Sequence, residues 1–292
     1  MKTVITTIST EDYFQHYLPL YIYILRKEYP EYDVKTFIKG KTDELTKKAF
    51  AYLREHIEFE DPIQVFKNYG LLESTINCLR FLVPEKHFKG YDYVIFTDLD
   101  LLIFRSKPTL LNWHLKRMKR LRTCYAGHRG PKLQPHRPEI SFEGWVGRFK
   151  RVAAGFFMAT PEWFKRTKTA RARYKKKARC GKLGGYREMD EVMLARILKE
   201  SKLPVPPLYK KENFKIDERG IHLGDFKYSM KKRYESLRKM RKKVTNKNIK
   251  KFYDLDNDPI WQGLIKILCK DPKIKKRLNR ATEVLENIRK KK

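Results

Sequence analysis

Two hydrophobic periods alternate along the first hundred residues. Short apolar and β-branched runs, typical of buried strands, cover residues 4–8, 34–38 and 93–97. Between these runs, apolar residues recur at helical spacing over 11–28, over 42–57 and within 61–83. An alternation of strands with helices predicts an α/β domain with a mostly parallel central sheet.

Beyond residue 100 the pattern is less regular. It predicts helices at 110–121 and 188–198, strands at 122–126 and 152–159, and a short strand that runs into a glycine-bearing loop at 219–227. Residues 127–151 are rich in Gly, Pro, His and Arg, which predicts a long irregular loop of the kind that is often functional. Residues 165–180 carry nine Lys and Arg and no acid.

The last 65 residues, 228–292, are expected to form a basic helical extension. An apolar stretch at 260–268 predicts packing against the preceding domain. The final segment places one apolar stripe among Lys and Arg side chains, formed by Ile274, Leu278, Ala281, Leu285 and Ile288. A basic amphipathic helix can lie on a membrane, but packing against the parent domain is the more frequent reason for such a stripe, and it is the interpretation that we favour.

Charge is distributed very unevenly. The chain has 67 Lys and Arg against 34 Asp and Glu, a net charge of +33. Residues 1–110 hold 15 basic and 16 acidic residues, whereas residues 111–292 hold 52 and 18. A field of this size attracts anionic partners, so nucleic acid, an anionic membrane surface and a phosphorylated acceptor are the candidates.

The N-terminal apolar run is too short for a signal peptide, and no stretch of the sequence is long and apolar enough for a transmembrane helix. The four cysteines are far apart and form no C-x-x-C pair, which argues against a zinc site and fits a reducing compartment. We therefore expect a cytoplasmic protein, with peripheral attachment to a membrane through its charge as a further possibility.

The strand at 93–97 runs directly into Asp98 and Asp100. Alternate side chains of an extended chain lie on one face, so both carboxylates can point at one ligand. Open α/β sheets bind ligands beyond the carboxyl ends of their strands. Two carboxylates there suit Mn²⁺ or Mg²⁺, whose remaining positions phosphate and water can fill. Alternatively, an acidic pair after a strand only caps a turn or the next helix.

Five segments carry a family resemblance through their order along the chain. They are Arg80-Phe81-Leu82-Val83-Pro84, Phe96-Thr97-Asp98-Leu99-Asp100, Ala154-Gly155-Phe156-Phe157-Met158, Asp190-Glu191 and His222-Leu223-Gly224-Asp225-Phe226-Lys227. With them, the chain resembles the GT-A-fold nucleotide-sugar glycosyltransferases. It is most similar to the retaining family of bacterial lipopolysaccharide galactosyl- and glucosyltransferases and glycogenin, known as glycosyltransferase family 8. The resemblance covers residues 1–227, which implies a nucleotide-binding half, 1–110, and an acceptor-side half, 111–227.

The resemblance also implies roles for individual residues. Asp98, Asp100 and His222 would bind Mn²⁺ or Mg²⁺ against the donor diphosphate. Lys227 would pair with the diphosphate, and Gly224 would let the loop backbone approach it. The other implied donor-binding residues are Thr6, Thr7, Arg80, Ala154 and Gly155. Asp190 would bind the sugar hydroxyls, and Glu191, where relatives often have Gln, is a candidate nucleophile or base.

The implied activity is transfer of a sugar, with retention, from a nucleotide-sugar donor such as a UDP-sugar to a glycan, glycolipid or protein-linked acceptor. Cleavage of a glycosyl–phosphate bond builds negative charge on the diphosphate, which a divalent cation and a lysine stabilise. It builds positive charge on the sugar, which the carboxylates of Asp190 or Glu191 can stabilise. The alternative is a basic nucleic-acid-binding protein, or a transferase that acts on modified DNA. Nucleic acid is the less favoured partner because the basic runs lack regularly interleaved aromatic residues.

Overall fold

The computed structural model describes residues 1–10, 12–67, 69, 73–127, 155–183, 190–204, 220–223 and 246–290. The chain forms two compact units. Unit 1 comprises residues 1–8, 64–98 and 111–214, and unit 2 comprises residues 9–63, 99–110 and 215–292.

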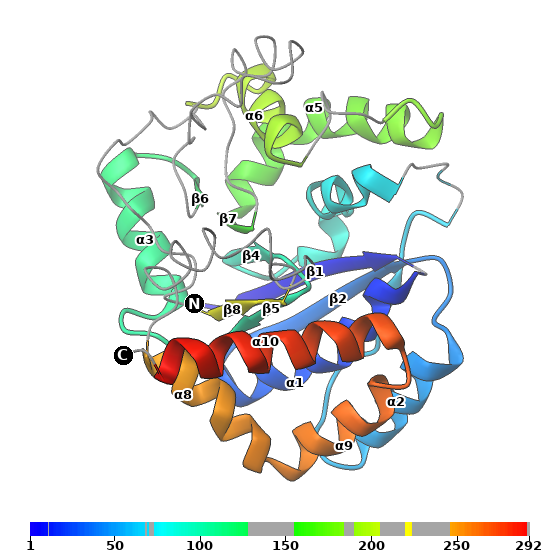
Figure 1. Ribbon diagram of the computed structural model, residues 1–292. Coiled ribbons are helices and arrows are strands. Elements are labelled where there is room, and N and C mark those ends of the chain that lie inside the picture. The colour runs from blue at the N-terminus through cyan, green and yellow to red at the C-terminus, as the bar shows by residue number, and fades with distance from the viewer. Residues whose placement is uncertain are drawn as a thin grey trace, which may run out of the picture. The chain divides into compact units, whose positions relative to one another are not determined.

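Figure 1 labels the helices and strands. The strands are β1 (Thr3–Thr10), β2 (Asp33–Lys39), β3 (Ile63–Gln64), β4 (Tyr93–Thr97), β5 (Leu101–Ile103), β6 (Tyr125–Gly127), β7 (Phe156–Ala159) and β8 (Gly220–His222). The α-helices are α1 (Tyr17–Glu28), α2 (Glu44–Arg54), α3 (Leu110–Leu121), α5 (Pro161–Arg179), α6 (Asp190–Glu200), α8 (Asn246–Asp254), α9 (Pro259–Leu268) and α10 (Pro272–Lys290). Short 3₁₀ helices cover Tyr13–His16, Glu73–Leu82, Glu85–Phe88 and Leu255–Asn257.

Six strands form one sheet in the order β3, β2, β1, β4, β7, β6. In unit 1, β4 pairs in parallel with β1, from Thr3 opposite Tyr93 to Thr6 opposite Phe96. Its other edge pairs antiparallel with β7, which in turn pairs antiparallel with β6. The predicted α/β fold is confirmed, and the parallel pairing of β1 with β4 is consistent with the expected mostly parallel sheet. The antiparallel edge was not predicted.

Aromatic side chains fill the core of unit 1. Phe96 on β4 and Phe157 on β7 are fully buried and contact each other with ring centroids 6.2 Å apart, and Trp163 on α5 packs against both. Arg171, also on α5, is buried and donates to the Phe81 carbonyl at 2.7 Å. Burial lowers the pKa of Arg171 to about 10. The helix is thus fixed to the segment that leads into β4.

In unit 2, α9 packs against α1 and α2, and Figure 1 shows it beside α2. Gly263 makes this approach possible because a Cβ at this position would collide with the ring of Tyr52. Asp258 begins α9 and accepts hydrogen bonds from the backbone N–H of Ile260 and of Trp261, both at 3.0 Å. Its carboxylate also accepts from the Tyr23 hydroxyl and the Lys27 ammonium on α1.

The apolar stripe of α10 is buried. Ile274, Ala281 and Leu285 have no exposed surface, and Leu278 is 6% exposed. The side chain of Ile288 lies outside the described part of the chain. The helix contacts α8 and the 3₁₀ helix at Tyr13–His16, both in unit 2. These contacts support packing against the parent domain as the reason for the stripe.

Several expected boundaries differ from the observed ones. The strand expected at 122–126 begins only at Tyr125, because Arg122 has a φ of 50° and turns the chain after α3. The helix expected over 11–28 is divided into a 3₁₀ turn and α1. The strand β5 was missed altogether: its three residues are too few to show a period. The loop expected at 127–151 lies, apart from Gly127, outside the described residues.

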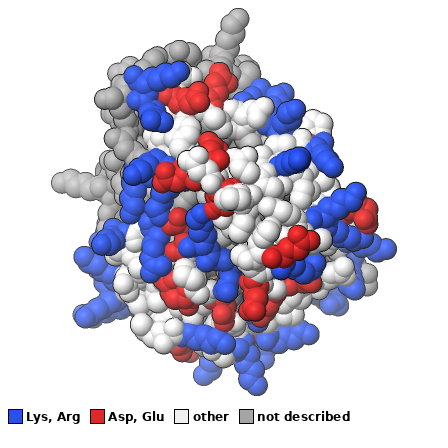
Figure 2. All heavy atoms as spheres, turned by 90° about the horizontal axis from the view of Figure 1, so that it is seen from below, with Lys and Arg blue, Asp and Glu red and all other residues white. Residues whose placement is uncertain are grey.

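On the face seen in Figure 2, basic and acidic side chains are interspersed rather than gathered by sign. The large positive charge therefore does not form a single patch on this face. No described helix has the length and hydropathy needed to cross a membrane.

Candidate functional site

The Asp-x-Asp sequence follows β4 directly, as the pattern predicted. Asp98 is the last residue of its segment of unit 1, and Asp100 belongs to unit 2. Their side chains are fixed by different partners, and each set of contacts lies within one unit.

Arg80 holds Asp98. Its Nη1 donates to Asp98 Oδ1 at 2.5 Å and to the Thr97 carbonyl at 3.0 Å. The guanidinium is 3% exposed and the Asp98 side chain 27% exposed, so the charge pair is shielded on the side of Arg80 and open on the side of Asp98. Buried charge-assisted hydrogen bonds of this kind are strong and directional. Arg80 therefore orients this carboxylate, and its expected part in donor binding stays a prediction.

Gly155 makes room for the other oxygen of Asp98. The Asp98 backbone N–H donates to the Gly155 carbonyl at 3.3 Å, one residue beyond the β4–β7 pairing. A Cβ at position 155 would lie 2.6 Å from Asp98 Oδ2, closer than real contacts allow. Glycine is thus needed here for the close approach of a carboxylate. The neighbouring Ala154, also expected at the site, lies outside the described residues.

Thr6 and Thr7 lie on β1, beside β4, and both are buried. Thr7 Oγ1 donates to the Thr97 carbonyl at 3.0 Å, the same carbonyl that Arg80 contacts. Thr6 Oγ1 is buried and has no hydrogen-bond partner among the described residues. Successive side chains of a strand point to opposite faces, so the two hydroxyls lie on different sides of the sheet. Thr7 supports the end of β4, and the role expected for Thr6 toward a nucleoside stays a prediction.

In unit 2, the β5–β8 ladder brings Asp100 and His222 together. The pairing places Leu101 opposite His222, and the Leu223 N–H donates to the Asp100 carbonyl at 2.7 Å. Asp100 Oδ1 lies 3.1 Å from His222 Nε2. Gly220 at the start of β8 is required because a Cβ there would collide with the Leu102 carbonyl.

Arg277 on α10 faces the second oxygen of Asp100, a contact that no sequence pattern predicted. Its Nη1 lies 4.0 Å from Asp100 Oδ2 and donates to the Tyr17 hydroxyl at 3.0 Å. The guanidinium also packs over the rings of Phe14 and Tyr17. Nothing distinguishes Arg277 in the sequence from the other basic residues around it, which is why it was missed.

The surroundings of Asp100 favour its ionised form. Burial would by itself raise the pKa of the Asp100 carboxyl, but the charge and hydrogen bond of His222 and the charge of Arg277 outweigh it, and the pKa is lowered. An ionised carboxylate beside an imidazole is the chemical form that binds divalent metals.

Asp100 and His222 are in direct hydrogen-bond contact, and an ion bound by both would take the place of that bond. Two neighbouring ligands of an octahedral ion at about 2.1 Å would lie about 3 Å apart, and the Asp100–His222 separation is 3.1 Å. Arg277 contacts the opposite oxygen of Asp100, so it does not occupy the space between the pair. Among the described residues, however, no three His, Cys, Asp or Glu side chains gather closely enough to hold an ion on their own.

The remaining predicted residues lie largely outside the described part of the chain. Asp190 begins α6, as expected, but the side chains of Asp190 and Glu191 are not described. Gly224 and Lys227 lie in the segment that follows β8 and are not described either. Their roles stay predictions from the resemblance.

No family model and no curated protein matches the chain. Solved structures with partial similarity include the galactosyltransferase LgtC with donor and acceptor sugar analogues, at 16% identity over 65% of this chain and 69% of that one, with a TM-score of 0.40. The glycosyltransferase GlyE of Streptococcus pneumoniae has 15% identity over 74% of this chain and 47% of that one, with a TM-score of 0.40. Core-mannan synthase A of Aspergillus fumigatus, in an Mn/GDP form, has 12% identity over 68% of this chain and 69% of that one, with a TM-score of 0.43.

Proposed function

We propose that this chain is a metal-dependent glycosyltransferase that moves a sugar from a nucleotide-sugar donor, a UDP-sugar in the first instance, to a glycan, glycolipid or protein-linked acceptor. The observation that carries the proposal is the set of contacts that hold the two aspartates after β4. Asp98 is clamped by Arg80 beside a glycine, and Asp100 is hydrogen-bonded to His222 in surroundings that favour its ionised form.

The two carboxylates are suited to one ligand because a single residue separates them, which keeps their Cα atoms within about 7 Å of each other. With His222 they would hold Mn²⁺ or Mg²⁺. Such an ion binds few protein groups and completes its coordination with phosphate oxygens and water. When bound, the ion would neutralise charge on the departing diphosphate.

The protein groups would orient the metal ligands and bind the donor. Arg80 would keep Asp98 oriented, and the described contacts of Thr7 would keep the end of β4 in place. By the resemblance, Lys227 and Gly224 would bind the diphosphate, and Asp190 and Glu191 would stabilise the sugar as positive charge develops. Transfer with retention follows from the same resemblance.

The test is hydrolysis of a UDP-sugar without acceptor, with and without Mn²⁺. We expect slow, Mn²⁺-dependent release of UDP, and we expect Asp100→Asn to lower it by about a hundredfold, since the loss of a metal ligand removes several kcal/mol of transition-state stabilisation. Asp61→Asn is the matched control because Asp61 is exposed and, among the described residues, pairs with Arg54 at the surface. Unchanged hydrolysis in Asp100→Asn would contradict the proposal.

A further inference from the structure

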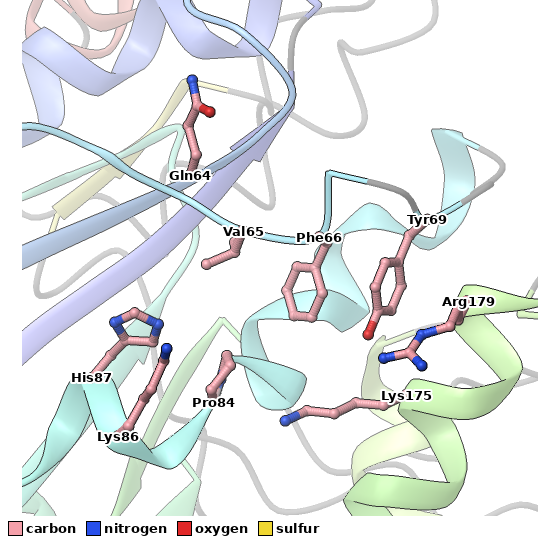
Figure 3. A pocket seen from close by; sticks show the side chains of 9 residues that line it. All are labelled: Gln64, Val65, Phe66, Tyr69, Pro84, Lys86, His87, Lys175 and Arg179. Atoms are coloured by element: carbon pink, nitrogen blue, oxygen red, sulfur yellow. The ribbon is translucent and has the colours of Figure 1, made fainter.

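A cavity lies within unit 1, and its lining residues are different from those of the proposed donor site. Its volume is about 340 Å³. Three segments line it (Figure 3): the chain after β3, the 3₁₀ helix before β4 and the end of α5. The lining residues are Gln64, Val65, Phe66, Tyr69, Pro84, Lys86, His87, Lys175 and Arg179. None of the residues placed at the proposed donor site is among them.

The cavity is basic. Its lining includes Lys86, Lys175, Arg179 and His87 and contains no Asp or Glu. Lys175 is the most notable of these residues because burial and the nearby charge of Arg171 lower its pKa to about 8. No carboxylate of the described residues pairs with Lys175. Glu85 acts on it only at longer range and does not cancel the shift. A half-buried cation without a counter-ion is costly, and a bound anion would remove that cost.

One wall of the cavity is aromatic. The rings of Phe66 and Tyr69 meet edge to face, with centroids 4.9 Å apart. Phe66 has a φ of 57°, an uncommon left-handed conformation for a bulky residue, and it directs the chain so that both rings face the cavity. Arg179 lies over the Tyr69 ring at 5.8 Å. In Figure 3 the Lys175 side chain extends from α5 toward Phe66 and Pro84, so its ammonium lies at the aromatic wall.

We propose that this cavity binds a small phosphorylated ring compound, with the phosphate among Lys86, Lys175 and Arg179 and the ring against Phe66. Cavities of about 300–1,000 Å³ that combine an apolar wall with a few convergent polar groups are typical of small-molecule sites. Phosphate is an anion that Lys and Arg side chains lining one cavity would bind. The cavity is too small for more than one or two units of a polymer, so an extended polyanion is the less suitable occupant.

Pyridoxal 5′-phosphate is a suitable probe because it joins a phosphate to a flat ring and carries an aldehyde. A lysine amine that lies next to the bound aldehyde condenses with it, with loss of water, and borohydride then reduces the imine to a stable secondary amine. The full chain would be labelled in EDTA, which removes any metal-dependent donor binding, and the modified peptides would be mapped by mass spectrometry.

We expect Lys175 to be modified about tenfold more than Lys168 and Lys176, because a lysine with a lowered pKa has more free amine. Lys168 and Lys176 lie exposed on the same helix, α5. Inorganic phosphate in excess should protect Lys175 and leave the other two unaffected. Equal labelling of the three lysines, or no protection by phosphate, would overturn the proposal.

A binding measurement separates a specific site from general attraction to a basic protein. In EDTA, Lys175→Gln should raise the Kd for pyridoxal 5′-phosphate by about tenfold, the loss expected for one charge-assisted contact. The adjacent Lys176→Gln, which removes the same charge outside the cavity, should change it less than about twofold. Equal effects of the two variants would show binding to the surface charge alone. Mn²⁺-dependent binding of a UDP-sugar should be the same in both variants, so the two proposals can fail independently.

Discussion

The contact between Asp98 and Gly155 illustrates how one residue can decide a site. A methyl group at position 155 would meet Asp98 Oδ2 at 2.6 Å, and Arg80 holds the other oxygen. The carboxylate therefore cannot move away without losing its hydrogen bond. Sequence reasoning found both residues, but only as parts of separate motifs. Their contact depends on the register of β4 with β7, which no local pattern encodes.

Gly155→Ala should consequently reduce Mn²⁺-dependent UDP-sugar hydrolysis by about tenfold or more, since small displacements of a positioning group are costly in catalysis. Its effect on the free energy of unfolding should stay within about 1 kcal/mol, as is usual away from a packed core. Gly90→Ala is an instructive control. Its Cβ would meet no atom within 4 Å, but its φ is 87°. It should cost about 1 kcal/mol of stability and leave hydrolysis intact. Full hydrolysis in Gly155→Ala would contradict the assigned role.

At the scale of elements, Asp258 connects the beginning of α9 with α1. Its carboxylate caps the helix and accepts from Lys27 and Tyr23. Burial tends to raise the pKa of the Asp258 carboxyl, but the hydrogen bonds from Lys27, Tyr23 and Trp261 outweigh it, so the pKa is lowered. The folded state thus favours the ionised form. This contribution to stability is present above the unfolded pKa of about 3.9 and is lost as the pH falls through the lower, folded value.

Asp258→Ala should therefore lower the free energy of unfolding by about 1–2 kcal/mol near neutral pH, the usual effect of losing a helix cap. Urea denaturation at a series of pH values would test this, and the difference from the unmodified protein should shrink in acid. Asp254→Ala, four residues earlier at an exposed position, should have little effect at any pH. A difference that is constant with pH would show that the charge of Asp258 is not what stabilises α9.

The elements themselves were predicted best where apolar periodicity was long. The strands β1, β2 and β4 and the helices α1 and α2 were found because buried strands and amphipathic helices have distinct periods. The two-stranded β5–β8 ladder was only half predicted, because strands of three residues carry almost no periodic signal. The ladder brings Asp100 together with His222, more than a hundred residues further along the chain. That these two residues share a site was predicted from the family resemblance and not from periodicity.

At the scale of the whole molecule, the net charge of +33 remains the most unusual property. Charges of both signs are interspersed on the face in Figure 2, and the described part of the apolar stripe of α10 is buried. The buried ion pairs and caps of unit 2 show that part of this charge serves the fold. Arg277, which is 7% exposed, packs beside Asp100 and not in solvent.

The central claim is a metal-dependent donor site at Asp98 and Asp100, and thermal melting tests it most directly. The protein would be melted with UDP-, GDP-, CMP- and dTDP-sugars, each with and without Mn²⁺. A ligand at a hundredfold excess over its Kd stabilises the folded form by about 2.7 kcal/mol. We predict a rise in Tm with one nucleotide class that requires Mn²⁺ and disappears in Asp100→Asn. No rise with any donor, or an equal rise in Asp100→Asn, would contradict the account.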